Sequence, residues 1–269
     1  MESELLVDRR EGWMVLTLNR PERLNALNEK LHRLLAEALE EAAHESCRAV
    51  LLTGTGRAFC AGEDVGGLAL AAAEFQRSGA LPPDLGVTVE AHYNPLIRRI
   101  RRLRKPVVCA VNGVAAGAGA NIALACDIVL AARSAKFVQA FASIGLVPDS
   151  GGTFFLPRLI GEARARALAL LGEPLPAETA QAWGLIWQVV DDGALRGEAE
   201  KLAARLAKGP TLSLAWIKEA LNASSANDLD AQLDLERNLQ SLAGRTPDYR
   251  EGVLAFLEKR PANFTGRAS

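Results

Sequence analysis

The chain has 269 residues, 49% of them hydrophobic, which is enough to bury a substantial core. A formal net charge of -1 and an aromatic content of 5% argue against a protein whose main partner is a nucleic acid or an anionic membrane. Residues 1–4 lack the basic start of a signal peptide, and no segment approaches the roughly 18 apolar residues of a membrane span. We therefore expect a globular, cytoplasmic protein without nucleic-acid or membrane partners.

The cysteines and histidines are few and widely spaced. No two of the cysteines form a C-x-x-C pair, and the histidines do not have the spacing of a metal site. We expect buried, reduced thiols and no metal. The residues are Cys47, Cys60, Cys109, Cys126, His32, His44 and His92.

The N-terminal part alternates between strand and helix patterns. Residues 4–9 and 13–19 are predicted strands, and residues 28–45 a helix that Asn28 caps. Its apolar stripe consists of Leu31, Leu34, Leu35 and Leu39. Two further strands are predicted at residues 49–53 and 107–111, and each runs into a glycine-rich turn.

The two glycine-rich turns are FCAGED at residues 59–64 and NGVAAGAG at residues 112–119. Each is expected to open a helix, where backbone N–H groups lack partners and can point at one oxygen. Two such donors on a thioester carbonyl would stabilise an enolate. The second helix is predicted to end at Ala125, and residues 127–131 again have a strand pattern. Repeated strand-turn-helix units indicate an α/β layered core.

The segment between these turns contains a predicted loop and a basic helix. Residues 79–86 form the loop, with Pro82 and Pro83 in it. The run RRIRRLRK at residues 98–105 has helical spacing. We expect a solvated or subunit-facing surface here, with phosphate binding as the alternative.

Asp149 lies in the turn LVPDSGG at residues 146–152, just before an apolar helix. An Asp in this place is a good helix cap, but Ser150 can supply the cap and leave the Asp149 carboxylate as a candidate base. Beyond Pro174 the pattern is helical, apart from a strand-like segment at residues 186–190. The apolar stripe along residues 229–242 is expected to pack on the core and on neighbouring subunits, the alternative being an exposed monomeric tail.

Four segments carry a resemblance to a known family: LNRPERLNAL (18–27), GRAFCAGED (56–64), KPVVCAVNGVAAGAG (105–119) and GLVPDSGG (145–152). In this order they resemble the crotonase, or enoyl-CoA hydratase/isomerase, superfamily. The resemblance implies an α/β fold, with a crotonase-like ββα superhelix and thioester site in residues 1–194 and a helical trimerisation region in residues 195–269. It also implies an acyl-coenzyme A thioester substrate, no separate cofactor, and a homotrimer or dimer of trimers.

The family's roles fall on three residues of this chain. The resemblance makes the backbone N–H groups of Glu63 and Ala118 the two oxyanion donors, with no role for the Glu63 side chain. It makes Asp149 the catalytic carboxylate, a proton shuttle that takes a proton from the acyl chain and returns it elsewhere on that chain. Gly62 and Gly117 are expected to supply backbone geometry that a Cβ would obstruct. We expect apolar neighbours to raise the pKa of Asp149, namely Phe141, Ile144, Leu146 and Val147.

One difference from the family's hydratases limits the reactions that this chain is expected to catalyse. The positions of their two glutamates hold Asn121 and Phe141, neither of which is a general base, so simple hydration is not expected. Segments at residues 110–120, 187–192 and 232–237 resemble the isomerase branch that converts ring-1,2-epoxyphenylacetyl-CoA to oxepin-CoA in phenylacetate degradation. The resemblance thus implies that reaction and the isomerisation of 3-enoyl-CoA to 2-enoyl-CoA.

Two alternative functions remain open, an aromatic acyl-CoA dehalogenase and a non-catalytic binding protein. The superfamily's aromatic acyl-CoA dehalogenases use a tryptophan and a histidine, where this chain has Phe141 and Asn94; His92 is two residues away, a rotation of about 200° on a helix. A non-catalytic thioester- or RNA-binding homologue would not need Asp149.

The resemblance also places coenzyme A. It implies contacts from Arg23, Leu24, Ala26, Ala61 and Asp64, completed by Phe256 and Lys259 from the same or a neighbouring subunit. The acyl pocket is expected chiefly from residues 65–77 and 81–96.

Overall fold

The computed structural model describes residues 3–64, 66, 73, 74, 76–79 and 84–268. The strands fall into two sheets, one ordered β1-β2-β3-β5-β7-β10 and the other β4-β6-β8-β9. Their bounds are β1 (Leu5–Arg10), β2 (Trp13–Leu18), β3 (Ala49–Gly54), β4 (Ala58–Cys60), β5 (Val107–Val111), β6 (Val114–Ala116), β7 (Ile128–Ala132), β8 (Lys136–Val138), β9 (Leu175–Pro176) and β10 (Gln188–Val190).

Successive strands alternate between the two sheets, so that β3, β5 and β7 lie in the first and β4, β6 and β8 in the second. All the neighbouring pairs among these six strands that share a sheet are parallel. Each superhelical turn of the chain thus adds one strand to each of the two sheets, which confirms the expected ββα superhelix. β2 and β5 are buried along their whole length, as strands covered on both faces must be.

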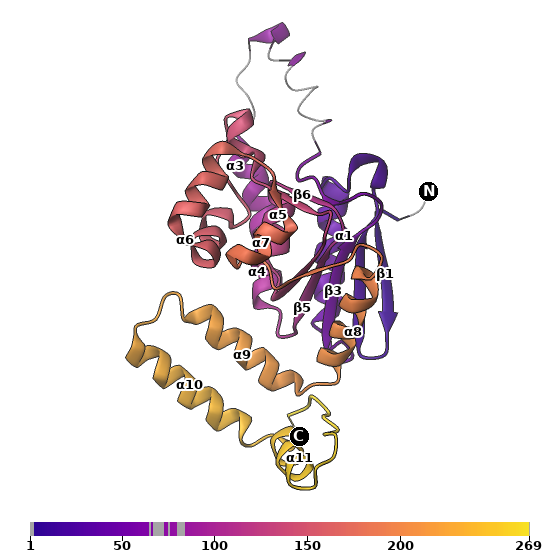
Figure 1. Cartoon of the computed structure of the whole chain (residues 1–269), viewed down its shortest axis with the longest axis vertical. Helices are drawn as coiled ribbons and strands as arrows, with labels where there is room; N and C mark the ends of the chain where they lie inside the picture. The colour runs from indigo at the N-terminus through magenta and orange to yellow at the C-terminus, as the bar shows by residue number, and fades with distance from the viewer. Residues whose placement is uncertain (1–2, 65, 67–72, 75, 80–83, 269) are drawn as a thin grey trace.

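The helices cover the sheets and extend beyond them (Figure 1). Their bounds are η1 (Pro21–Arg23), α1 (Glu29–Ala42), α3 (Leu85–Thr88), η2 (Val89–Tyr93), α4 (Asn94–Arg102), α5 (Ala118–Ala125), η3 (Ala140–Ile144), α6 (Gly152–Leu171), α7 (Ala177–Trp183), α8 (Leu195–Ala207), α9 (Thr211–Ala223), α10 (Leu229–Ala243) and α11 (Pro247–Leu257). Asn28 caps α1 by accepting a hydrogen bond from the Leu31 N–H at 2.8 Å, as expected.

The short strands β4, β6 and β8 were not predicted, because three residues carry too little pattern to distinguish a strand from a turn. The basic helix also differs from expectation, since α4 ends at Arg102 and part of its charge is engaged within the chain. Arg101 donates to Asn222, and Arg104 pairs with Glu219 at 3.2 Å. Both partners lie on α9. The predicted solvated surface is confirmed for Arg98, Arg99, Arg102 and Arg104, which are exposed, whereas Arg101 is half-buried against α9.

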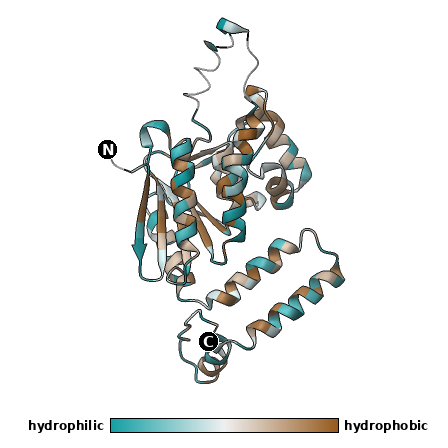
Figure 2. Ribbon diagram, turned by 180° about the vertical axis from the view of Figure 1, so that it is seen from behind, coloured by the Kyte–Doolittle hydropathy of each residue, from teal (hydrophilic) through white to brown (hydrophobic). Residues whose placement is uncertain are grey.

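The C-terminal helices divide into two groups. α8 packs on β3 and β5 of the six-stranded sheet, whereas α9, α10 and α11 project away from both sheets (Figure 1). Buried Lys218 joins α9 to the core through Asp127 at 2.8 Å. Hydrophobic residues recur along the projecting helices (Figure 2), and several of their large side chains are exposed. The assignment of residues 195–269 to oligomerisation remains a prediction.

All four cysteines are buried and unpaired, as expected. Within the described part of the chain, no helix is both long and apolar enough to cross a membrane.

Candidate active site

The first glycine-rich turn leaves one backbone donor unpaired. Leu27 and Glu63 form a parallel bridge in which the Leu27 N–H donates to the Gly62 carbonyl at 2.7 Å and the Asp64 N–H donates to the Leu27 carbonyl at 2.8 Å. In such a bridge the paired residue directs its own N–H away from the partner strand. Accordingly, the N–H of Glu63 has no hydrogen-bond partner among the described residues.

The second turn supplies a donor at a helix start. Gly117 adopts φ 51°, and α5 begins at Ala118, whose N–H lies in the first turn, where helical N–H groups lack partners. A Cβ added at Gly62, which has φ 93°, would lie 3.6 Å from the Ala118 nitrogen. The two turns therefore meet, and both glycines have a positive φ, a backbone geometry that a Cβ would disfavour, as expected.

The second sheet brings these turns together. β4 pairs with β6 and β6 with β8, all parallel, so their carboxyl ends lie at one edge. Glu63 follows β4, Ala118 follows β6, and Phe141 follows β8. A Cβ at Gly119 would lie 2.8 Å from the Cys60 Sγ, so a glycine lets the start of α5 approach β4 this closely. The site is thus set by strand register and by backbone packing.

The Asp149 carboxylate is free of capping. Ser150 and Gly151 both have positive φ, 50° and 80°, and α6 begins after them with no side-chain cap. The expectation that Ser150 caps this helix is wrong, because its hydroxyl donates instead to Asp149 Oδ1 at 2.9 Å. A non-glycine residue in the left-handed region costs conformational energy and is typical of functional turns.

A buried amide pair, not recognised from the sequence, holds the Asp149 turn against α5. Asn121 Nδ2 donates to the Asp149 carbonyl at 2.8 Å, and Gln139 Nε2 donates to Asn121 Oδ1 at 2.8 Å. Both amides are almost fully buried. Asn121 is three residues after Ala118, on the same face of α5, so the pair holds the Asp149 backbone against the helix about one turn from the Ala118 N–H. A polar residue in the otherwise apolar α5 was the available signal.

Burial raises the pKa of Asp149, and the hydrogen bond from Ser150 opposes that shift. The expected direction is therefore confirmed, but the expected cause is only partly right. Phe141 is buried and its ring would lie 3.6 Å from a Cβ at Gly117. Ile144, Leu146 and Val147 are exposed, so they do not enclose the carboxylate in the single chain.

The Glu63 side chain also belongs to the site, which the sequence did not indicate. Its Oε2 accepts a hydrogen bond from the hydroxyl of Tyr93, a buried residue at the end of η2. Loss of hydration raises the pKa of Glu63, and nearby Asp64 and Asp149 raise it further. Asp149 thus lies close enough for its charge to raise the pKa of Glu63.

The residues expected to bind coenzyme A occupy two places. Near the first turn, the Ala61 N–H donates to the Leu24 carbonyl at 3.0 Å, and Arg20 binds both the Ala26 carbonyl and the Asp64 carboxylate. Arg23 is exposed beside them in η1. The structure thus gathers five of the seven residues, and their contacts with coenzyme A remain a prediction.

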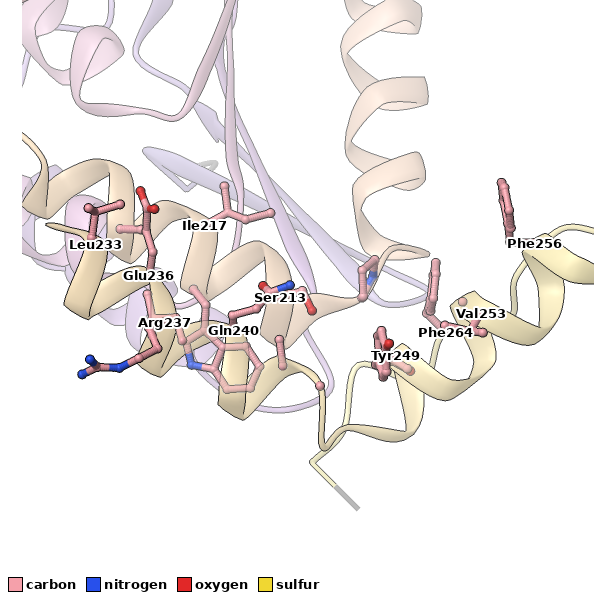
Figure 3. A pocket seen from close by; sticks show the side chains of 18 of the residues that line it. Ser213, Ile217, Leu233, Glu236, Arg237, Gln240, Tyr249, Val253, Phe256 and Phe264 are labelled. Carbon is pink, nitrogen blue, oxygen red and sulfur yellow. The ribbon is translucent and has the colours of Figure 1, made fainter.

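Phe256 and Lys259 lie elsewhere. α11 is distant from α5 and β6 in the single chain (Figure 1), and Phe256 is 83% exposed. Phe256 instead borders a cavity of about 930 Å³ between α9, α10 and α11, which Ile217, Leu233 and Tyr249 also line (Figure 3). The expected acyl-pocket residues 65, 67–72, 75 and 81–83, and Pro82 and Pro83 of the expected loop with them, lie outside the described residues.

Comparisons with known proteins agree with this geometry. Residues 8–267 match the family model for enoyl-CoA hydratase/isomerase. The chain is 57% identical over 258 residues to 1,2-epoxyphenylacetyl-CoA isomerase of Escherichia coli (strain K12), covering 96% of each chain. It is 38% identical over 266 residues to the 2,3-dehydroadipyl-CoA hydratase of the same organism, covering 98% of this chain and 100% of that one.

Among solved structures, the enoyl-CoA hydratase of Bacillus anthracis matches with a TM-score of 0.89 at 31% identity, covering 98% of this chain and 100% of that one. The relatives thus include an isomerase and hydratases. The side chains around the two backbone donors must therefore distinguish the reactions.

Proposed function

Because the chain belongs to the enoyl-CoA hydratase/isomerase family, we propose that it isomerises coenzyme A thioesters. The substrate proposed first is ring-1,2-epoxyphenylacetyl-CoA, converted to the seven-membered oxepin thioester in phenylacetate degradation. The relative with 57% identity carries the name of that isomerase. A second proposed reaction converts a 3-enoyl-CoA to the conjugated 2-enoyl-CoA.

The observation that carries this proposal is the placement of Asp149. Its carboxylate uses no capping bond, and its backbone is held by Asn121 one helical turn from the Ala118 donor. The positions that would hold the two hydratase glutamates are a buried amide engaged in two hydrogen bonds and a buried phenyl ring, Phe141. Neither group removes a proton from water, which supports isomerisation over hydration.

The proposed mechanism begins with the thioester oxygen between the N–H groups of Glu63 and Ala118. These fixed donors stabilise the negative charge that develops when Asp149 removes a proton from C2 of a 3-enoyl chain. The resulting dienolate is protonated at C4, which moves the double bond into conjugation with the carbonyl. A raised pKa suits Asp149 to this work, since proton transfer is most efficient when the pKa of the base approaches the working pH.

For the aromatic epoxide, the same pocket would hold the thioester while the ring expands. Substrate and product are isomers, so no net proton, oxidant or reductant is required. We propose that the charge of Asp149 assists this rearrangement from the same position. The reaction needs no cofactor beyond the coenzyme A of the substrate.

We also propose a homotrimer, or a dimer of trimers, built through α9, α10 and α11. Their exposed apolar side chains support this assembly, since monomeric proteins rarely leave large apolar patches uncovered. Phe256 and Lys259 would then complete the coenzyme A site of a neighbouring subunit.

The test is the ultraviolet absorbance of conjugation when protein is added to a 3-enoyl-CoA. The wild type should conjugate the double bond, and Asp149→Asn should lose at least about 100-fold in kcat. Hydration of a 2-enoyl-CoA serves as the control and should be slow in both. Equal rates in wild type and Asp149→Asn would reject the proposal in favour of a dehalogenase-like or non-catalytic homologue.

A further inference from the structure

Glu63 brings a carboxyl group to the thioester site along with its backbone donor. Its N–H is the proposed first oxyanion donor, and its side chain begins only two bonds away from that nitrogen, at the Cβ. That side chain ends on the Tyr93 hydroxyl, which donates to Oε2. The other oxygen, Oε1, accepts no hydrogen bond from a described residue and is the atom left for a substrate.

The Tyr93 hydroxyl is held in place by an aromatic stack. Tyr93 is 3% exposed, and its ring meets the edge of His32 with 4.4 Å between centroids. His32 in turn stacks on His92 at 5.5 Å. Burial, and secondarily His92, lowers the pKa of His32 to about 4, so this ring is neutral at physiological pH. As a neutral, packed neighbour, His32 fixes the Tyr93 ring and its hydroxyl without adding a charge of its own.

The groups that face Glu63 are Tyr93, His92, Asp64 and Asp149. Tyr93 and His92 favour the charged carboxylate, whereas loss of hydration and the two aspartates favour the protonated acid. The charge of Asp64 is itself engaged by Arg20 at 2.7 Å. Asp149 pairs with no cation among the residues that the structure describes. When two carboxyl groups share a site, their environments can separate their pKa values, so that one serves as the acid and the other as the base.

We propose that Glu63, positioned by Tyr93, is a second catalytic residue, a carboxylic acid that protonates the dienolate at C4 while Asp149 only accepts the proton from C2. This inference rests on the proposed isomerase function. The electrons of the C2–H bond enter the dienolate, and those of the shifting double bond form the new C4–H bond with the proton of Glu63. Proton exchange with water then returns Asp149 to the carboxylate and Glu63 to the acid.

The first experiment needs no substrate. Carboxyl-¹³C glutamate is incorporated, the Glu63 resonance is assigned by its loss in Glu63→Gln, and its titration is followed by NMR. The pKa of Glu63 should lie above that of an exposed glutamate. Asp149→Asn should lower it by removing a negative charge, and Tyr93→Phe should raise it by removing a bond to the charged form. An ordinary pKa that neither variant moves would overturn the inference.

The second experiment follows turnover of a 3-enoyl-CoA deuterated at C2. Glu63→Gln keeps the backbone donor, so KM should change little while kcat falls about 100-fold or more. The alkaline limb of the pH profile, where Glu63 loses its proton, should disappear in Glu63→Gln and move to higher pH in Tyr93→Phe. Glu37→Gln, an exposed acid on α1, is the matched control and should behave as wild type.

The deuterium label distinguishes a mechanism in which Asp149 alone transfers the proton from one in which Asp149 and Glu63 share the work. With Glu63 as acid, the wild-type product takes its C4 proton from solvent, and the slow Glu63→Gln reaction passes more deuterium from C2 to C4 through Asp149. A Glu63→Gln enzyme with wild-type rate and label transfer would overturn this inference and leave the Asp149 isomerase intact. Absence of isomerisation by the wild type would instead reject both.

Discussion

At the scale of single residues, Asp149 combines two opposing environments. Burial favours its neutral form, while Ser150 donates a hydrogen bond that favours the charged form. The residue can therefore lose and regain a proton without either state being strongly trapped. Its turn is held from the other side by Asn121, which contacts the carbonyl and leaves the carboxylate free.

The pKa shift of Asp149 predicts a pH-dependent gain in stability for Asp149→Asn. The pKa of Asp149 in the folded state is raised above its ordinary value of 3.8. The free energy of unfolding therefore falls as the pH rises from that value through the folded-state pKa. Asparagine is neutral throughout. The variant should have a higher Tm than the wild type at pH 7, with the difference shrinking toward pH 4. An equal or lower Tm at pH 7 would contradict this account.

The buried amide pair predicts a separate effect for Asn121→Ala. The change leaves the Asp149 carbonyl and the Gln139 amide without their partner, which should cost about 2 kcal/mol in the free energy of unfolding. Because the Asp149 turn is then less well held, kcat should fall more than KM rises. Chemical denaturation and steady-state kinetics measure the two. Gln188→Ala removes an exposed amide and should leave both unchanged; unaltered kcat in Asn121→Ala would refute the positioning role.

At the scale of elements, the site depends on how closely α5 approaches β4. A Cβ at Gly119 would lie 2.7 Å from the Cys60 Cβ, too close for either element to keep its place. Gly119→Ala should therefore displace the Ala118 donor and lower kcat by about 100-fold, the usual effect of losing one oxyanion donor. Overpacking should also destabilise the fold by about 1–3 kcal/mol.

Gly197→Ala is the matched control, since Gly197 lies on the exposed face of α8 and a Cβ there meets nothing within 4 Å. That variant should keep full activity and gain about 0.5–1 kcal/mol, because alanine favours helix. Kinetics and thermal unfolding of the two variants test the argument together. If Gly119→Ala were as active as Gly197→Ala, close backbone packing would not be what sets the donor.

The elements also show what the sequence could predict. The strands with continuous apolar runs, the capped helix α1 and both glycine turns were found because their patterns are local. The contacts between Tyr93 and Glu63 and between Asn121 and Asp149 were missed, since they join segments that only the fold brings together. The exposure of Val147 was likewise missed, because an apolar run does not reveal which side faces solvent.

At the scale of the whole molecule, the two groups of residues expected to hold coenzyme A lie at different ends. The C-terminal tail is fixed between the start of β3 and α11, because Arg48, just before β3, donates to the Phe264 carbonyl at 3.0 Å and Asp248 of α11 accepts from the Gly266 N–H at 2.8 Å. Phe256 and Lys259 therefore stay away from the glycine turns of their own chain (Figure 1). If they bind coenzyme A, they bind it at the site of a neighbour.

Mixed oligomers test this arrangement. Asp149→Asn subunits keep Phe256 and Lys259 of the tail but lose the catalytic base. Phe256→Ala/Lys259→Glu subunits keep the base but lose these two tail residues. An oligomer of either variant alone should therefore be poorly active at low substrate concentration. After the two are unfolded together and reassembled in equal amounts, about a quarter of the sites should pair an intact base with an intact neighbouring tail. Activity should then recover to about a quarter of wild type. If the tail served its own chain, mixing would restore nothing, since no single subunit carries both intact parts.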